Sequence, residues 1–162
     1  MNSDIRHFPL AQFLFINMVK KSMHREKRGI MANSERIMLI DDNEITLRSL
    51  SKALEMNGFP NHKFDNPITA LKNYNPDTYP IVVSDFRMPQ LNGIELLNYI
   101  KAKNSKVKMI IYTGFPCEKI SHQIISLGAR EFYKPINLEQ LLGCLEKMKI
   151  EINKLKNIKE EK

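Results

Sequence analysis

Short, mostly apolar runs recur along this chain, and each is followed by a stretch that favours a helix. The strongest runs are residues 37–40, 80–84 and 107–112, which read as strands buried on both faces. Weaker strands are predicted over residues 60–64 and 130–133. Helices are predicted after the strands, at residues 44–57, 66–74, 94–103, 117–127 and from about 137 onward. Five strand–helix repeats predict an α/β fold in which helices cover both faces of a parallel sheet.

Polar side chains stand where these strands end. Asp41 and Asp42 follow the first strand, Asp85 ends the third, Thr113 the fourth and Lys134 the fifth. Ligands of open α/β sheets bind outside the carboxyl ends of the strands, so these side chains are expected to meet. Clustered carboxylates need a compensating cation, and Mg²⁺ prefers oxygen ligands. A carboxylate can also serve as a nucleophile and form an aspartyl phosphate, which predicts a phosphoryl-transfer site.

These motifs, taken together and in order, resemble the receiver domain of two-component response regulators. The resemblance covers about residues 35–149 and implies a flavodoxin-like, doubly wound sheet of five parallel strands in the order 2-1-3-4-5. The segments that carry it are Asp41-Asp42, Ser84-Asp85-Phe86-Arg87-Met88-Pro89, Asn92-Gly93, Ile111-Tyr112-Thr113-Gly114 and Lys134-Pro135.

The resemblance also implies a role for each residue of the site. Asp85 is expected to be the phosphoacceptor, and Thr113 and Lys134 are expected to contact the phosphoryl group. Mg²⁺ is expected to bind Asp42, Asp85 and the backbone carbonyl of Arg87 directly, and Asp41 through a water molecule. For Tyr112 and Phe115, near the site, packing and chemistry both stay open. Asp41, Asp42 and Asn43 have a second reading, as the cap of the helix that follows.

The function implied is that of a cytoplasmic signalling switch rather than an enzyme. A histidine kinase would phosphorylate Asp85, and the surface around the fourth helix, the fifth strand and the fifth helix would signal to a partner protein. Only 28 residues follow Lys134, so we expect a stand-alone receiver without an output domain of its own. Relay of the phosphoryl group to a histidine phosphotransfer protein is an alternative.

Two other classes of function fit the sequence less well. An aspartate-nucleophile phosphatase of the haloacid dehalogenase type needs Asp-x-Asp after the first strand, where this chain has Asp41-Asp42-Asn43-Glu44. A DNA-binding regulator would need a helix-turn-helix after the receiver, and the residues that follow Lys134 show no such pattern. We therefore expect no specific nucleic-acid binding.

The fifth strand departs from the family pattern. The switch aromatic usually stands three residues before the lysine, where this chain has Glu131, and counting from Gly128 instead selects Phe132. The segment is thus one residue short, and the switch is either Phe132 or Tyr133. Because side chains alternate along a strand, these two aromatics are expected to point to opposite faces.

Residues 1–34 have no place in the strand–helix pattern and form a basic extension. They hold six basic and two acidic residues and so account for most of the net charge of +7. The apolar run at residues 8–19 is too short to span a bilayer, which needs about 20 residues. We expect the segment to be disordered or dispensable. Two cysteines without metal or disulfide spacing fit reduced thiols in the cytosol.

Residues 150–162 form a C-terminal extension that is predicted either as a continued helix or as a charged tail. A helix over residues 138–158 would outrun the sheet and leave Ile152 and Leu155 with nothing beneath them. Such a stripe predicts a partner, which could be a second copy of the chain in a homodimer.

Overall fold

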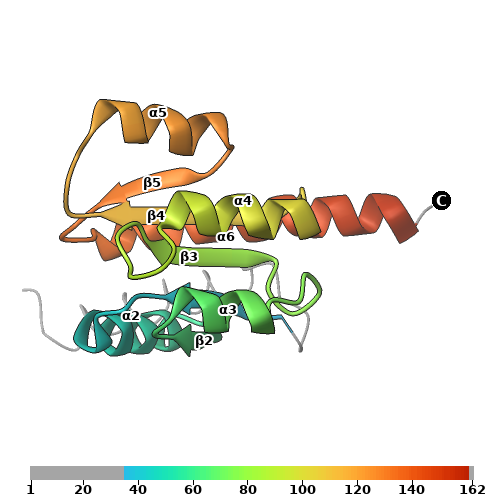
Figure 1. Cartoon of the computed structure of the whole chain (residues 1–162). Coiled ribbons are helices and arrows are strands. Elements are labelled where there is room, and N and C mark those ends of the chain that lie inside the picture. The colour runs from blue at the N-terminus through green and yellow to red at the C-terminus, as the bar shows by residue number, and fades with distance from the viewer. Residues whose placement is uncertain (1–34, 161–162) are drawn as a thin grey trace, which may run out of the picture. The chain divides into compact units, whose positions relative to one another are not determined.

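The computed structural model describes residues 35–160, which form one parallel sheet of five strands flanked by five helices. The strand order is β2-β1-β3-β4-β5, which confirms the predicted doubly wound topology and is visible as a stack from β2 to β5 in Figure 1. Every neighbouring pair is parallel. The elements are β1 (Ile37–Ile40), α2 (Glu44–Met56), β2 (Asn61–Phe64), α3 (Pro67–Asn73), β3 (Ile81–Asp85), α4 (Gly93–Lys103), β4 (Lys108–Thr113), α5 (Glu118–Ser126), β5 (Arg130–Tyr133) and α6 (Leu138–Glu160).

The alternation of side chains along the central strands builds two apolar layers. In β1, Met38 and Ile40 face α3, α4 and α5, whereas Ile37 and Leu39 face α2 and α6. β1 and β3 are buried along their whole length, which explains why their sequences are almost continuously apolar. The polar ends of these strands therefore emerge from a closely packed core at a single edge of the sheet.

Asparagine caps fix the points at which the chain turns from strands into helices. The Asn43 side chain accepts a hydrogen bond from the Thr46 N–H at the start of α2. At the start of α4, Asn92 and Glu95 form a reciprocal capping box. Of the three residues that the alternative interpretation assigned to the cap, only Asn43 caps α2 with its side chain.

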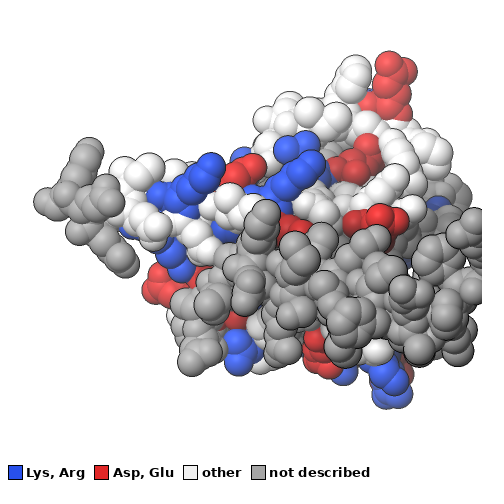
Figure 2. Space-filling view, turned by 180° about the vertical axis from the view of Figure 1, so that it is seen from behind, with Lys and Arg blue, Asp and Glu red and all other residues white. Residues whose placement is uncertain are grey.

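Helix α6 extends to Glu160 and projects beyond the sheet (Figure 1). The expectation that Ile152 has nothing beneath it is wrong, because this side chain packs against the apolar layer under α2 and α6. Two ion pairs hold the same stretch, Lys108 with Glu151 and Lys156 with the buried Glu35. Leu155 is exposed, as expected, with 44% of its surface accessible. Figure 2 shows basic and acidic side chains interspersed on this projecting end.

Among residues 35–160, no helix is both long and apolar enough to cross a membrane. The basic extension, residues 1–34, lies outside the described residues. The domain boundaries predicted at positions 34 and 149 therefore stay predictions.

Gly93 is the first residue of α4, and its Cα lies close to the backbone at the end of β3. A Cβ at position 93 would lie 2.9 Å from the backbone oxygen of Asp85 and 3.2 Å from the Cα of Phe86. Because backbone atoms cannot move aside cheaply, Gly93→Ala should lower the free energy of unfolding by about 1–3 kcal/mol. Gly143→Ala in α6 is the matched control, since a Cβ there meets nothing within 4 Å. That control should raise stability by about 0.5–1 kcal/mol.

Urea denaturation of both variants measures the difference. Equal stabilities for Gly93→Ala and the wild type would contradict the close approach of α4 to Asp85.

Candidate functional site

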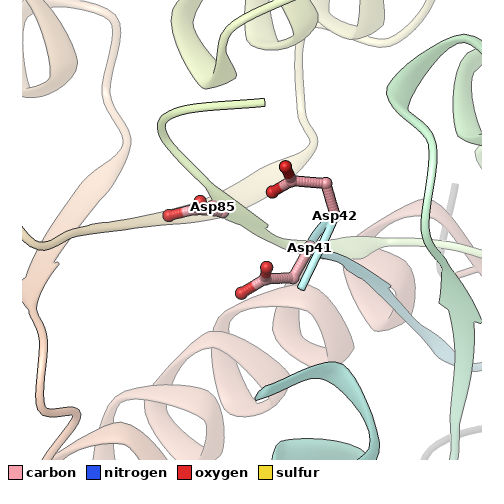
Figure 3. Close-up of side chains that lie close together, drawn as sticks. All are labelled: Asp41, Asp42 and Asp85. Carbon is pink, nitrogen blue, oxygen red and sulfur yellow. The ribbon is translucent and has the colours of Figure 1, made fainter. Parts of the chain in front are cut away.

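Three aspartates converge at the carboxyl ends of β1 and β3. Asp41 and Asp42 follow β1, and Asp85 is the last residue of β3. One carboxylate oxygen from each lies within 4.8 Å of those of the other two. Figure 3 shows the three side chains close together, with Asp41 and Asp42 leaving the chain on opposite sides. Asp41 and Asp85 are buried and Asp42 is exposed, so the cluster opens to solvent at one point.

Asp41 is held on both of its carboxylate oxygens. The backbone N–H of Asn43 donates to Oδ1 at 2.7 Å, and the hydroxyl of Tyr112 donates to Oδ2 at 2.9 Å. The side chain is fully buried, and a buried carboxylate requires such donors to remain charged. Its orientation is therefore determined by the protein itself.

Lys134 supplies the positive charge next to the cluster. Its Nζ atom lies 3.1 Å from Oδ1 of Asp85 and 3.5 Å from Oδ2 of Asp41. The same ammonium group lies 5.1 Å from the centre of the Tyr112 ring. The backbone N–H of Lys134 donates a hydrogen bond of 2.8 Å to the backbone carbonyl of Thr113, which holds the lysine next to the end of β4.

Burial raises the pKa of Asp85 above the ordinary value for an aspartate. Desolvation is the main cause, the hydrogen bond and charge of Lys134 oppose it, and the neighbouring charge of Asp41 adds to it. One ammonium group among three carboxylates leaves the cluster with excess negative charge. The donors are all carboxylate oxygens, so the residues present fit a hard divalent cation such as Mg²⁺.

Thr113 lies beside the cluster, but its hydroxyl is bonded elsewhere. Its Oγ1 accepts a hydrogen bond of 3.1 Å from the backbone N–H of Phe115. The ring of Phe115 in turn lies beneath the guanidinium group of Arg87, 3.4 Å from the ring centre. This stack joins the loop after β3 to the loop after β4 at the mouth of the site.

The two candidate switch aromatics lie on opposite faces of the sheet. Phe132 pairs in register with Tyr112 and packs against the layer under α2 and α6. Tyr133 pairs with Thr113, and its hydroxyl lies 3.3 Å from Ser121 of α5. The Tyr133 hydroxyl also donates to Glu131 at 3.0 Å. Glu131, at the position where the family usually carries its aromatic, therefore lies next to Tyr133.

Sequence reasoning named Tyr112 without settling its role, and the structure gives the residue a specific contact. The Tyr112 side chain is fully buried, and its hydroxyl bonds to a carboxylate of the cluster. The available signal was a phenol in the last buried positions of a strand otherwise built from aliphatic side chains. A buried phenol almost always has a hydrogen-bond partner, but the sequence does not show which acceptor it is, because Asp41 lies two strands away.

Comparison with known proteins places the chain in a family. A family model described as the response regulator receiver domain matches residues 37–146, so the chain belongs to the receiver domain family. Receiver domains are signalling switches that are phosphorylated by histidine kinases and bind Mg²⁺ at an acidic pocket. The family resemblance predicted from the sequence motifs is thereby confirmed.

Relatives of different lengths share this domain. The response regulator receiver protein CpdR of Brucella abortus is 30% identical over 117 residues, which cover 72% of this chain and 98% of CpdR. The transcriptional regulatory protein FixJ of Bradyrhizobium diazoefficiens is 34% identical over 117 residues, which cover 72% of this chain and 57% of FixJ. The match to the regulatory protein AtoC of Escherichia coli, 30% identical over 68% of this chain, covers 24% of AtoC. The chain thus spans from about a quarter to just over half the length of several relatives.

Solved structures agree with the fold. A receiver domain protein from Methanospirillum hungatei superposes with a TM-score of 0.69 at 25% identity, covering 74% of this chain and 97% of that one. A receiver domain from Clostridium thermocellum gives a TM-score of 0.71 at 23% identity, covering 75% and 98%.

The excess of buried negative charge predicts that neutralising Asp85 stabilises the protein. Folding raises the pKa of Asp85. The ionised carboxylate therefore lowers the free energy of unfolding at pH values above the raised pKa of the folded state, and this loss disappears below the ordinary pKa of the unfolded state. At neutral pH without divalent cations, Asp85→Asn should therefore raise the free energy of unfolding by about 0.5–2 kcal/mol. The gain should shrink as the pH falls through the raised pKa.

Denaturation at neutral and acidic pH measures this effect. Asp77→Asn is the control, because Asp77 is exposed at the opposite end of β3 and should change stability by less than about 0.5 kcal/mol. A loss of stability in Asp85→Asn at neutral pH would contradict the electrostatic reading of the cluster.

Proposed function

We propose that this chain is a phosphorylation-controlled switch in which Asp85 accepts a phosphoryl group from a histidine kinase. The observation that carries the proposal is the position of the Asp85 carboxylate, between a cluster of acidic side chains and the ammonium of Lys134. An acidic pocket of this kind is the feature by which receiver domains bind Mg²⁺. Asp85 also belongs to the part of the chain that the family model matches.

The transfer itself follows from the chemistry of these groups. A carboxylate oxygen of Asp85 attacks the phosphorus atom and forms the new oxygen–phosphorus bond. The bond from phosphorus to the histidine nitrogen of the kinase breaks, and that nitrogen keeps the electron pair. Lys134 favours the ionised form of Asp85 before transfer and contacts a phosphoryl oxygen afterwards. Its Nζ at 3.1 Å is already within reach of both tasks.

Asp42, Asp85 and the backbone carbonyl of Arg87 would hold Mg²⁺, with Asp41 contributing through a water molecule. When bound, the cation neutralises charge on the transferring phosphoryl group. The exposure of Asp42 supports a direct contact, since this carboxylate faces solvent from which a cation arrives. The two hydrogen bonds on Asp41 support an indirect one, because both of its oxygens already have partners.

The switch would begin at Thr113. To donate to a phosphoryl oxygen, its hydroxyl must give up the hydrogen bond of 3.4 Å that it donates to the Phe115 carbonyl, which would loosen the loop after β4. We assign the aromatic switch to Tyr133 rather than Phe132, because Tyr133 pairs with Thr113 and contacts α5. The affected surface then comprises α5, β5 and the start of α6, where Ile125, Tyr133 and Leu138 expose apolar area to a partner protein.

The output partner on this proposal is another protein. CpdR, which this chain matches over nearly the whole length of CpdR, is named as a receiver protein. A histidine phosphotransfer protein that takes the phosphoryl group onward remains the alternative. An aspartate-nucleophile phosphatase receives no support from the geometry, because its nucleophile would stand on the first strand. There Asp41 is fully buried and bonded on both oxygens.

The first test of this function is phosphorylation by a small-molecule donor. Incubation with acetyl phosphate and Mg²⁺ should add a single phosphoryl group, detected as a shift in intact mass. Asp85→Asn should abolish the shift, and chelation of Mg²⁺ should suppress it in the wild type. An unchanged shift in Asp85→Asn would show that another residue is the acceptor.

The second test separates the two aspartates that follow β1. Asp42→Ala should weaken Mg²⁺ binding by more than about tenfold, a loss of about 1.4 kcal/mol or more, because a direct ligand is removed. Asp41→Ala should weaken binding by a smaller factor, because its contact passes through water. Calorimetric titration of both variants gives the affinities. The reverse order of the two effects would exchange the proposed roles.

A further inference from the structure

We propose that Tyr112 is a positioning residue of the cation site, acting through the hydrogen bond from its hydroxyl to Asp41. This inference rests on the proposed function, since it assigns part of the same site. It concerns a residue for which the motifs left packing and chemistry equally open.

The position of Tyr112 in the sheet makes the contact possible. Tyr112 pairs in register with Asp85 on the neighbouring strand, so its Cα stands beside the phosphoacceptor. Its side chain enters the layer under α2 and α6 and is fully buried. From β4 the phenol reaches past β3 to the end of β1, where its oxygen lies 2.9 Å from Oδ2 of Asp41.

The hydroxyl, rather than the ring, carries this role. A buried phenol oxygen must find a partner, and Asp41 at 2.9 Å is closer than the carbonyl of Ile40 at 3.4 Å. A hydrogen bond to a charged acceptor is stronger than one between neutral groups. The fully buried hydroxyl therefore donates its hydrogen bond to the Asp41 carboxylate.

Two donors then determine the plane of the Asp41 carboxylate. The Asn43 N–H holds Oδ1, and the Tyr112 hydroxyl holds Oδ2. Carboxylates at metal sites are commonly oriented by such hydrogen bonds, and loss of the hydrogen-bond partner lowers the affinity for the metal. Without the hydroxyl, Oδ2 would keep the more distant ammonium of Lys134, at 3.5 Å, as its donor, and the carboxylate could turn toward it.

Tyr112→Phe isolates the hydroxyl, because it keeps the ring that packs in the core and faces Lys134. This variant should weaken Mg²⁺ binding by a factor on the order of three, less than the tenfold typical of partners to direct ligands, since Asp41 acts through water. Phosphorylation by acetyl phosphate should slow at low Mg²⁺ and recover at saturating Mg²⁺. A purely structural role would not produce this recovery.

Tyr79→Phe is the matched control. Tyr79 is also buried, and its hydroxyl lies 2.7 Å from Nδ1 of His62, away from the aspartate cluster. It loses the same atom from another buried tyrosine, although the partner of that hydroxyl, His62, is exposed. Any general effect of removing the hydroxyl of a buried tyrosine should appear in both variants. The Mg²⁺ affinity of Tyr79→Phe should equal that of the wild type.

A double-mutant cycle tests whether Tyr112 acts through Asp41. In the Asp41→Ala background, Tyr112→Phe should cause no further loss of Mg²⁺ affinity, because the hydroxyl has no carboxylate to orient. Calorimetric titration with Mg²⁺ alone measures all four proteins, and thermal unfolding checks that each is folded.

The outcomes separate the two proposals. Wild-type affinity in Tyr112→Phe, with Mg²⁺ binding and phosphorylation of the wild type intact, overturns the role of Tyr112 and leaves the proposed function standing. An equal loss in Tyr79→Phe, or an additive loss in the Asp41→Ala background, also overturns it. A wild type that binds no Mg²⁺ overturns both.

Discussion

A buried excess of negative charge at one edge of the sheet is the constraint on which the site depends. Three carboxylates converge there, and the Lys134 ammonium lies within ion-pair distance of two of them. Burial strengthens both the repulsion among the carboxylates and the attraction to any cation. The excess negative charge of such a site favours binding of a cation, and Mg²⁺ would supply the missing positive charge. On the proposed function, the phosphoryl group would then be bound to Asp85, the carboxylate nearest to the lysine.

The alternation of side chains at the strand ends divides the site between two faces of the sheet. Tyr112 and Phe132 share one face with α2 and α6, whereas Thr113 and Tyr133 share the other with α5. Tyr112 belongs to the buried core beneath the cluster, and Phe132 packs against that core. The second pair lies beside loops and an exposed helix, which can shift at lower cost. On the proposed function, the core would hold the reacting groups in place, and the conformational response would pass toward α5.

Much of this architecture could be predicted from the sequence, because the strands at the centre of the sheet are buried on both faces and so are apolar throughout. The same pattern located the ends of β1 and β3 and thus the cluster of aspartates. The partner of the Tyr112 hydroxyl could not be predicted, since it lies two strands away and depends on the register. The packing of Ile152 was missed because a periodic pattern shows which residues share a face, but not how far the neighbouring core extends.

The central claim is that Asp85, and not another carboxylate of the cluster, carries the phosphoryl group. Borohydride reduces an aspartyl phosphate to homoserine, so the acceptor can be located by peptide mass spectrometry after treatment with acetyl phosphate and Mg²⁺. Homoserine should appear in place of Asp85, with Asp41 and Asp42 unchanged. Reduction at Asp41 or Asp42, with Asp85 intact, would contradict the central claim.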